Sequence, residues 1–275
     1  MSEIVKAIIL GIVQGATEFI PVSSSGHLVI VPWLMGWAPS SLLFDTVLHW
    51  GTLLSIGVIF WQDFLQMIGA TLRSIGTRSL ADMYARLGWF IIVGSIPAAV
   101  TGLLFKDFFE ALFASPTAAA LFLLVTAFLL ISSELMMHYA EKLRTLETMN
   151  WLDAILIGLF QAVALAPGIS RSGTTMAAGL ARGIRREDAA RYSFLLGTPA
   201  FFGAGLLQLL QAMDESPGQL AAEAPMLVLG FVASAISGFI AIRFLLAYLR
   251  KHRLYPFAVY CIIVSIIVLG LSMRQ

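Results

Sequence analysis

Residues 10–27 read Leu-Gly-Ile-Val-Gln-Gly-Ala-Thr-Glu-Phe-Ile-Pro-Val-Ser-Ser-Ser-Gly-His, a dense group of polar side chains within an apolar chain. Gln14 and Glu18 are four residues apart and so share one face of a helix that Pro21 ends. Three serines, a glycine and His27 follow directly. Lipid cannot satisfy groups of this kind, so they belong in a cavity that protein encloses. The stretch predicts a functional site inside a membrane protein.

The composition agrees with a membrane-embedded chain. Of 275 residues, 59% are hydrophobic and only 12% are charged, whereas a soluble domain carries about 25% charged residues. The net charge of +1 and the lack of a long basic run exclude a nucleic-acid partner from our expectations. We predict an all-α polytopic membrane protein, a single integral membrane domain over 1–275. Apolar runs predict six transmembrane helices, near 42–61, 89–105, 117–137, 193–211, 225–247 and 255–272.

Two further apolar segments are each interrupted by a polar, Gly/Pro-containing hinge. At about 1.5 Å per residue, none of the four pieces comfortably crosses about 30 Å of hydrocarbon. We therefore expect two re-entrant helical hairpins whose tips lie at membrane depth inside protein. Two short spans per hairpin remain the alternative. The pairs are 4–20 with 27–37, joined by 21–26, and 151–166 with 176–183, joined by 167–175.

The two hairpin segments also resemble each other. A shift of 147 aligns residues 7–26 with 154–173, and seven of twenty positions are then identical. The matches include one Gln, two Ser and two Gly, which apolar bias does not produce. We predict an inverted repeat, approximately 1–140 and 151–275, whose two polar tips meet near mid-membrane.

Basic residues predict the orientation of the chain. The connections 70–86 and 182–191 and the loop after residue 247 are rich in arginine and lysine, which places them in the cytoplasm. The segments 106–115 and 212–224 are neutral or acidic and fit the outside.

The second tip contains one fixed cation, Arg171. A guanidinium at membrane depth needs an anion, and its planar fork suits two phosphate oxygens. Ser170, Ser172, Thr174 and Thr175 supply further hydroxyl groups. A permanent salt bridge to Glu18 is the alternative, and the two interpretations are compatible if a phosphate displaces or bridges the pair.

Together the tips contain a carboxylate, a histidine, an arginine and several hydroxyls, which are the groups that phosphoryl transfer requires. Simple N-capping by one serine, with His27 as a core histidine whose hydrogen bonds are satisfied, is the alternative for the first tip, although it does not account for three serines. We interpret His49 as structural and the single cysteine, Cys261, as a packed thiol. Inverted repeats with broken helices are also typical of transporters, so a transporter or flippase for a polyprenyl phosphate remains the rival function.

The same residues carry a resemblance to a known family. Gln14-x-x-x-Glu18 followed by Pro-Val-Ser-Ser-Ser-Gly-His resembles the (Glu/Gln)-x-x-x-Glu signature and downstream His of bacterial undecaprenyl-diphosphate phosphatases, also called bacitracin-resistance proteins. Residues 167–175 match that family's Pro-Gly-x-Ser-Arg-Ser-x-x-Thr motif at every fixed position. The resemblance covers essentially the whole chain. It implies a bacterial inner-membrane enzyme that hydrolyses undecaprenyl diphosphate to the monophosphate, recycles the lipid carrier for peptidoglycan synthesis and opens to the outer face.

The resemblance also implies roles for individual residues. Glu18 corresponds to the acidic residue of the first motif, Ser24 to the serine proposed as nucleophile, and His27 and Arg171 to further catalytic residues. The choice between Ser24 and His27 as the attacking group stays open. The family is usually stimulated by magnesium or calcium, which makes Glu18 a candidate metal ligand. The remaining residues expected to contact substrate are Gln14, Ser23, Ser25, Ser170, Ser172 and Thr175.

Gln14 departs from a common pattern, since many members have Glu at its position. This amide weakens any model in which two carboxylates jointly hold a metal. The expected partners are a polyprenyl diphosphate lipid and the surrounding membrane lipids. Assembly into a homo-oligomer stays open at this point.

Overall fold

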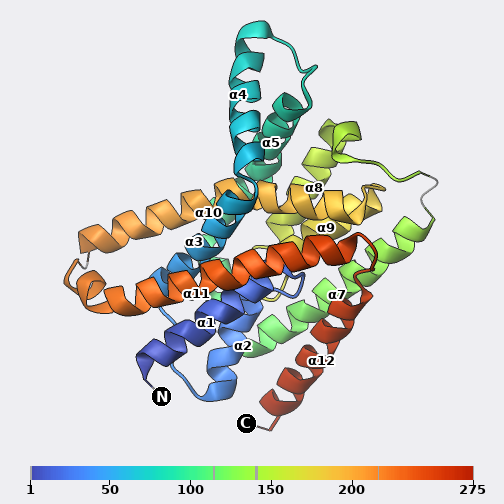
Figure 1. Ribbon diagram of the computed structural model, residues 1–275. Coiled ribbons are helices and arrows are strands. Elements are labelled where there is room, and N and C mark those ends of the chain that lie inside the picture. The colour runs from blue at the N-terminus through green and yellow to red at the C-terminus, as the bar shows by residue number, and fades with distance from the viewer. Residues whose placement is uncertain (1, 114, 140–141, 216, 275) are drawn as a thin grey trace.

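The structure, a computed structural model, describes residues 2–113, 115–139, 142–215 and 217–274. This part of the chain forms α-helices and one short 3₁₀ turn, with no β-strand (Figure 1). The helices are α1 (Glu3–Phe19), α2 (Ser24–Met35), α3 (Leu42–Ile59), α4 (Trp61–Thr77), α5 (Met83–Leu104), α6 (Lys106–Phe113), α7 (Pro116–His138), α8 (Trp151–Val163), α9 (Arg171–Ala181), α10 (Arg186–Glu215), α11 (Pro217–Leu249) and α12 (Tyr255–Ser272); the 3₁₀ turn is η1 (Leu146–Thr148).

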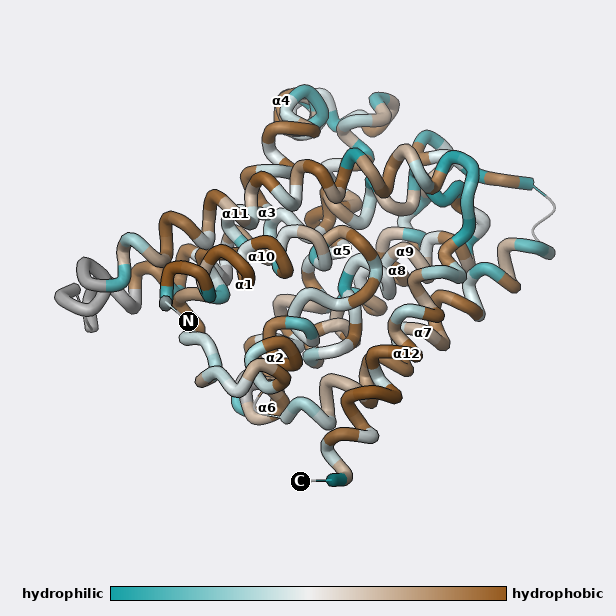
Figure 2. The backbone as a smooth tube through the Cα atoms, turned by 60° about the horizontal axis from the view of Figure 1, so that its bottom comes forward, coloured by the Kyte–Doolittle hydropathy of each residue, from teal (hydrophilic) through white to brown (hydrophobic). Residues whose placement is uncertain are grey.

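Six helices are long and apolar enough to cross a membrane, which confirms the six predicted spans. They are α3, α5, α7, α10, α11 and α12. Hydrophobic residues follow these helices along most of their length (Figure 2). The paired helices α1 with α2 and α8 with α9 contain 17, 12, 13 and 11 residues, respectively. Their short lengths fit re-entrant hairpins, whose depth in a bilayer stays a prediction.

Both hinges are shorter than predicted, because the second helix of each pair begins earlier. Ser23 accepts a hydrogen bond from Gly26 N at 3.2 Å, and Ser170 accepts one from Gly173 N at 3.0 Å. These serines cap α2 and α9, so the residues that follow them form first helical turns. Gly168 turns the chain between α8 and α9 with φ +97°, and a Cβ there would clash with the backbone of α7.

Two helices lie where connections were expected. α4 and α6 occupy parts of the segments 61–86 and 106–115. Both helices are amphipathic, and their polar residues interrupt the apolar ones. A search for continuous apolar runs therefore does not detect them. In Figure 1, α4 projects from the bundle beside the start of α5.

The hairpin helices pack across the two halves of the chain. α1 lies against α11, and α8 lies against α5. Both contacts use facing glycines: a Cβ on Gly11 would meet the carbonyl of Gly230, and a Cβ on Gly158 would lie 2.7 Å from the Cα of Gly94. Gly11 and Gly158 are the same position under the shift of 147. An inverted repeat requires reciprocal contacts of this kind; the repeat itself stays a prediction.

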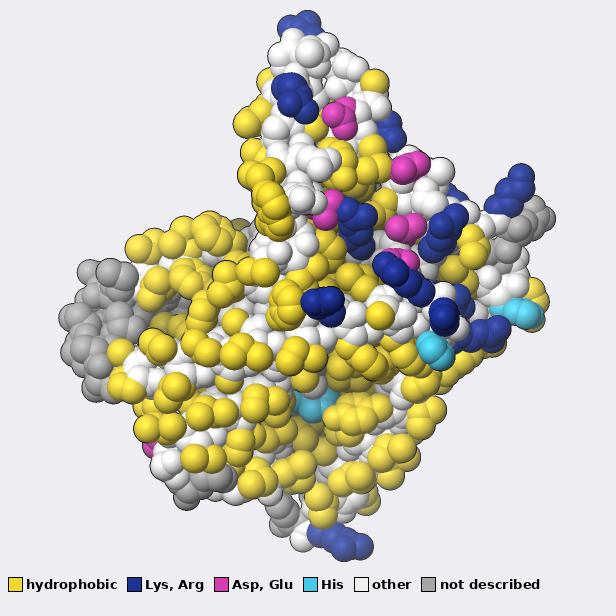
Figure 3. Space-filling view, viewed as in Figure 1, with side chains coloured by type: hydrophobic (Ala, Val, Ile, Leu, Met, Phe, Trp, Pro, Cys, Tyr) yellow, Lys and Arg dark blue, Asp and Glu magenta, His cyan; other side chains and the backbone are white. Residues whose placement is uncertain are grey.

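Ion pairs gather on one side of the molecule, around the ends of α4, α7, α8 and α11, where Figure 3 shows most of its Lys and Arg side chains. Asp153, which is fully buried, accepts hydrogen bonds from Arg144 and Arg182, and Glu134 binds Arg186. Arg250 donates to Glu187 at 3.0 Å, so the loop after residue 247 and the segment 182–191, both predicted to be cytoplasmic, lie together. The side chains of 211–222 lie outside the described residues, so the placement of 212–224 outside the cell stays a prediction.

The contact between α8 and α5 yields a stability prediction. Gly158→Ala places a methyl group against the Gly94 backbone, and we expect it to lower stability by about 1–3 kcal/mol, the usual cost of overpacking. Thermal unfolding of the purified protein in detergent measures the change. Gly57→Ala in α3 is the matched control, because a Cβ there meets nothing within 4 Å; equal melting temperatures for the two variants would contradict the contact.

Candidate functional site

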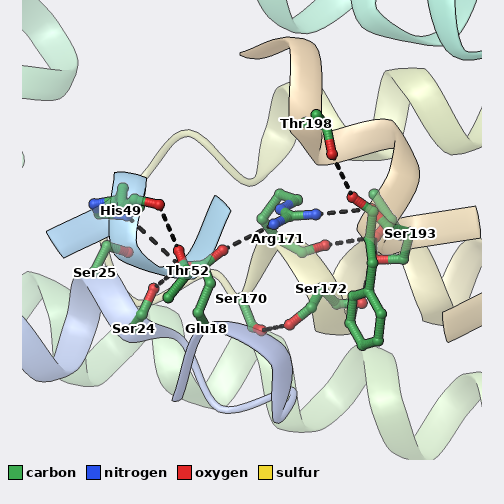
Figure 4. A network of polar contacts seen from close by, with 12 residues as sticks. Glu18, Ser24, Ser25, His49, Thr52, Ser170, Arg171, Ser172, Ser193 and Thr198 are labelled. Carbon is green, nitrogen blue, oxygen red and sulfur yellow. Dashed lines mark hydrogen bonds and ion pairs between the residues drawn. The ribbon is translucent and has the colours of Figure 1, made fainter. Parts of the chain in front are cut away.

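Glu18 is the centre of a polar network between the two tips (Figure 4). Its side chain is only 4% exposed, although it carries a charge inside an apolar bundle. Oε2 accepts hydrogen bonds from Ser24 Oγ at 2.5 Å and Gln14 Nε2 at 3.0 Å. Oε1 accepts from Arg171 Nη2 at 2.8 Å. His49 Nε2 lies 3.6 Å from Oε2. The carboxylate therefore joins α1, α2, α3 and α9.

Arg171 is held on several sides. Besides its bond to Glu18, Nη1 donates to the Ser193 carbonyl of α10 at 2.8 Å, and the guanidinium lies 4.5 Å from the centre of the Phe201 ring. Gly197 leaves the space for it, since a Cβ there would lie 2.7 Å from Nη2. The Nε–H of Arg171 is buried and has no partner in the described structure. The cation therefore keeps one donor for a further acceptor.

A cavity of about 240 Å³ lies between the tips. It adjoins a second cavity of about 620 Å³, and Ser25, His49 and Phe113 line both. The walls of the smaller cavity combine charged, hydroxyl and amide groups with apolar side chains. Its polar lining consists of Glu18, Ser23, Ser24, Ser25, His49, Gln161, Ser170 and Arg171.

Three of the residues predicted to contact substrate do not line this cavity but pack against residues that do. Gln14 is fully buried and bonds to Glu18. Ser172 lies within hydrogen-bond distance of Ser170, at 3.2 Å between the two Oγ atoms. Thr175 Oγ1 donates to the Arg171 carbonyl at 2.7 Å and lies 2.6 Å from Ser193 Oγ. These three side chains support residues of the lining.

His27 is also set apart from the cavity. Its Nδ1 lies 2.7 Å from the Ser23 carbonyl, and its Nε2 lies 2.8 Å from the Tyr260 hydroxyl of α12. The imidazole stacks on the Tyr260 ring with their centres 5.7 Å apart. Both ring nitrogens therefore have partners within the protein, and the histidine anchors the first turn of α2.

Four residues of the site region were not among the predicted site residues. His49 lies against Glu18, Gln161 lines the cavity, Ser193 holds Arg171 and Tyr260 holds His27. The repeat pointed to Gln161, which aligns with Gln14. No local pattern marks the others, since their neighbours come from distant segments. Cys261 is fully buried, as expected of a packed thiol.

The residues of the site can be compared with the ligands that a divalent cation, which the family resemblance implies, would need. No group of three or more His, Cys, Asp or Glu residues gathers anywhere in the described ranges. The cavity does supply one carboxylate, Glu18, whereas Gln14 lies behind the lining and donates to that carboxylate. Magnesium is commonly held by one or two carboxylates together with substrate phosphates. The residues fit a cation that a phosphate substrate helps to hold.

Comparison with known proteins identifies the family. Residues 7–267 match the model of the bacitracin resistance protein BacA. The chain belongs to the BacA family. Relatives named undecaprenyl-diphosphatase resemble this BacA family member over nearly their whole length. That of Methanosphaera stadtmanae is 43% identical over 282 residues, 99% of each chain. That of Desulforudis audaxviator is 42% identical over 270 residues, 98% of each chain.

The Glu18–Arg171 pair yields a second prediction about stability. Glu18→Ala leaves a buried guanidinium without its anion, and we expect a loss of about 3–5 kcal/mol. The double variant Glu18→Ala/Arg171→Ala removes both charges, so it should be less destabilised than the sum of the two single variants. Thermal unfolding in detergent of all four proteins measures the coupling. Additive losses would show that the two charges do not interact.

Proposed function

We propose that this protein hydrolyses undecaprenyl diphosphate to undecaprenyl phosphate and inorganic phosphate. The observation that carries the proposal is the Ser24 hydroxyl, which donates to Glu18 at 2.5 Å directly beside Arg171. A nucleophile, a base and a phosphate-binding cation thus lie in one enclosed cavity. The names of the relatives supply the substrate.

In the first step, Ser24 Oγ attacks the terminal phosphorus and its proton passes to Glu18. The bond between that phosphorus and the bridging oxygen breaks, and undecaprenyl phosphate leaves with the bond electrons. Arg171 neutralises the charge that develops on the phosphate oxygens. Phosphate oxygens also compete with Glu18 for the guanidinium, which frees the carboxylate to act as a base.

In the second step, water attacks the phosphoserine. Glu18 has passed its proton to the departing phosphate and now accepts a proton from the water. The bond from phosphorus to Ser24 Oγ breaks, the serine regains its proton from Glu18, and inorganic phosphate is released. Both ring nitrogens of His27 have protein partners, so we assign it the positioning of Ser24 rather than the attack.

A divalent cation, magnesium or calcium, is part of the proposal. Glu18 would hold it together with the phosphates of the substrate, and Gln14 would orient that carboxylate. When bound, it supplies positive charge to the phosphate oxygens.

The larger adjoining cavity is suited to the apolar part of the substrate. Its walls include Leu28, Val29, Trp33 and Leu42, and it meets the smaller cavity at Ser25. We infer that the diphosphate lies between the tips while the first part of the prenyl tail occupies this cavity. The rest of the tail reaches lipid, which has the same preference for apolar surroundings.

We place the protein in the bacterial inner membrane with the site open to the outer face. The basic segments gathered on one side support this orientation through the positive-inside rule. No observation specifically favours the rival transporter or flippase, and the relatives are named for a phosphatase.

The function predicts phosphate release by the purified protein in detergent. Wild type should release phosphate from undecaprenyl diphosphate, and a chelator should lower the rate until magnesium or calcium is restored. Gly197→Ala should reduce kcat/KM about 100-fold, because displacement of Arg171 by about 1 Å misplaces the phosphate. Gly203→Ala in the same helix is the control, since a Cβ there meets nothing within 4 Å.

No phosphate release by wild type under any of these conditions would refute the function. Equal rates for the two alanine variants would refute the role of Arg171. Sealed vesicles of the two orientations then distinguish the face from which substrate enters.

The choice of nucleophile predicts a covalent intermediate. Rapid quenching with SDS at neutral pH, where phosphoserine and phosphohistidine both persist, should trap phosphate from terminally ³²P-labelled substrate on wild type and on His27→Ala, whereas Ser24→Ala should carry none. An adduct that disappears only in His27→Ala would assign the attack to the imidazole. No adduct on any protein at rapid time points would instead indicate direct attack by water.

A further inference from the structure

Gln161, near the end of α8, has no role in the mechanism described above. Its side chain is only 3% exposed and lines the cavity between the tips, together with Ser24, Ser170 and Arg171. Neither Nε2 nor Oε1 has a hydrogen-bond partner in the described structure. A buried amide normally has partners, because its transfer from water is otherwise unfavourable.

The repeat explains why this amide is free. Gln161 aligns with Gln14, and Leu165 aligns with Glu18. In α1, Gln14 donates to the carboxylate one turn further along the same helix. The equivalent residue, Leu165, lies beyond the end of α8 and has an apolar side chain, which cannot accept a hydrogen bond. The glutamine is retained where its partner is absent, and the residue forms part of the cavity wall instead.

The chemistry of the cavity indicates what the amide binds. Arg171 lines the same cavity and keeps a buried, unpaired Nε–H, and the serines of both tips contribute hydroxyls. These donors require an acceptor with several oxygens. A diphosphate provides such oxygens, and an amide N–H that donates to a charged oxygen forms one of the stronger hydrogen bonds.

We propose that Gln161 is a substrate-binding residue whose Nε2–H donates to a phosphate oxygen of the bound diphosphate. Its Oε1 then accepts from a water molecule that enters with the substrate. This proposal rests on the proposed function. It makes the second hairpin contribute an amide as well as a cation to the substrate, whereas Gln14 of the first hairpin donates to Glu18.

Gln161→Leu tests the proposal through two independent measurements. It removes the amide and keeps a similar apolar volume, so its melting temperature in detergent should equal or exceed that of wild type. Its kcat/KM for phosphate release should fall about 10- to 100-fold, the effect of one lost hydrogen bond to a charged group. The kcat/KM of Gln161→Glu should fall further, because a carboxylate repels the diphosphate.

Leu159→Met is the matched control, since Leu159 lies on the same helix and is 49% exposed on the outer surface. It should leave both measurements unchanged. A kcat/KM for Gln161→Leu within twofold of wild type would overturn the proposal. A lower melting temperature of Gln161→Leu together with lost activity would overturn it too, because this result is expected if the amide stabilises the fold rather than binds substrate.

A binding measurement separates this proposal from the proposed function. Added undecaprenyl phosphate should raise the melting temperature of wild type, and the rise should be smaller for Gln161→Leu. If wild type releases no phosphate, the function fails, while this comparison still tests Gln161. Equal rises for the two proteins, or no rise in either, would count against the amide as a phosphate-binding group.

Discussion

The salt bridge between Glu18 and Arg171 is the contact on which the site depends. Removing two charges from water costs several kcal/mol per ion, and their attraction offsets this only when other hydrogen bonds complete their surroundings. Here Ser24 and Gln14 donate to the carboxylate, while the Ser193 carbonyl and the Phe201 ring receive the guanidinium. The polar residues of both tips are thus needed to keep one charge pair inside an apolar bundle.

That pair also defines the resting state of the cavity. Arg171 and Glu18 neutralise each other, so an incoming phosphate must take the guanidinium from the carboxylate. Under the proposed mechanism, this exchange exposes the carboxylate that accepts the proton of Ser24. A polar site inside an apolar bundle in this way keeps its charges paired until an anion enters, which suits a protein whose substrate has a charged head on an apolar tail.

Much of this architecture could be predicted from the sequence, for physical reasons. Bilayer thickness sets the length of an apolar span, so six spans and two interrupted pairs were recognisable. The meeting of Glu18 and Arg171 followed from the repeat. The amphipathic helix α4 escaped a search for apolar runs, and the capping bonds of Ser23 and Ser170 moved both helix starts. The environments of His27 and His49 could not be predicted, because Tyr260 and Glu18 reach them only through tertiary packing.

Each hairpin packs against a helix from the other half of the chain, which fixes the order in which its contacts can form during synthesis. α1 rests on α11, and about 200 residues separate them in the chain. At a synthesis rate of ~5–20 residues per second, α11 emerges ~10–40 s after α1. Arg171 lies about 150 residues after Glu18, so the carboxylate also lacks this partner for most of that interval. The N-terminal hairpin therefore needs a hydrated or chaperone-bound environment until its partners have been synthesised. The insertion machinery would supply that environment during folding.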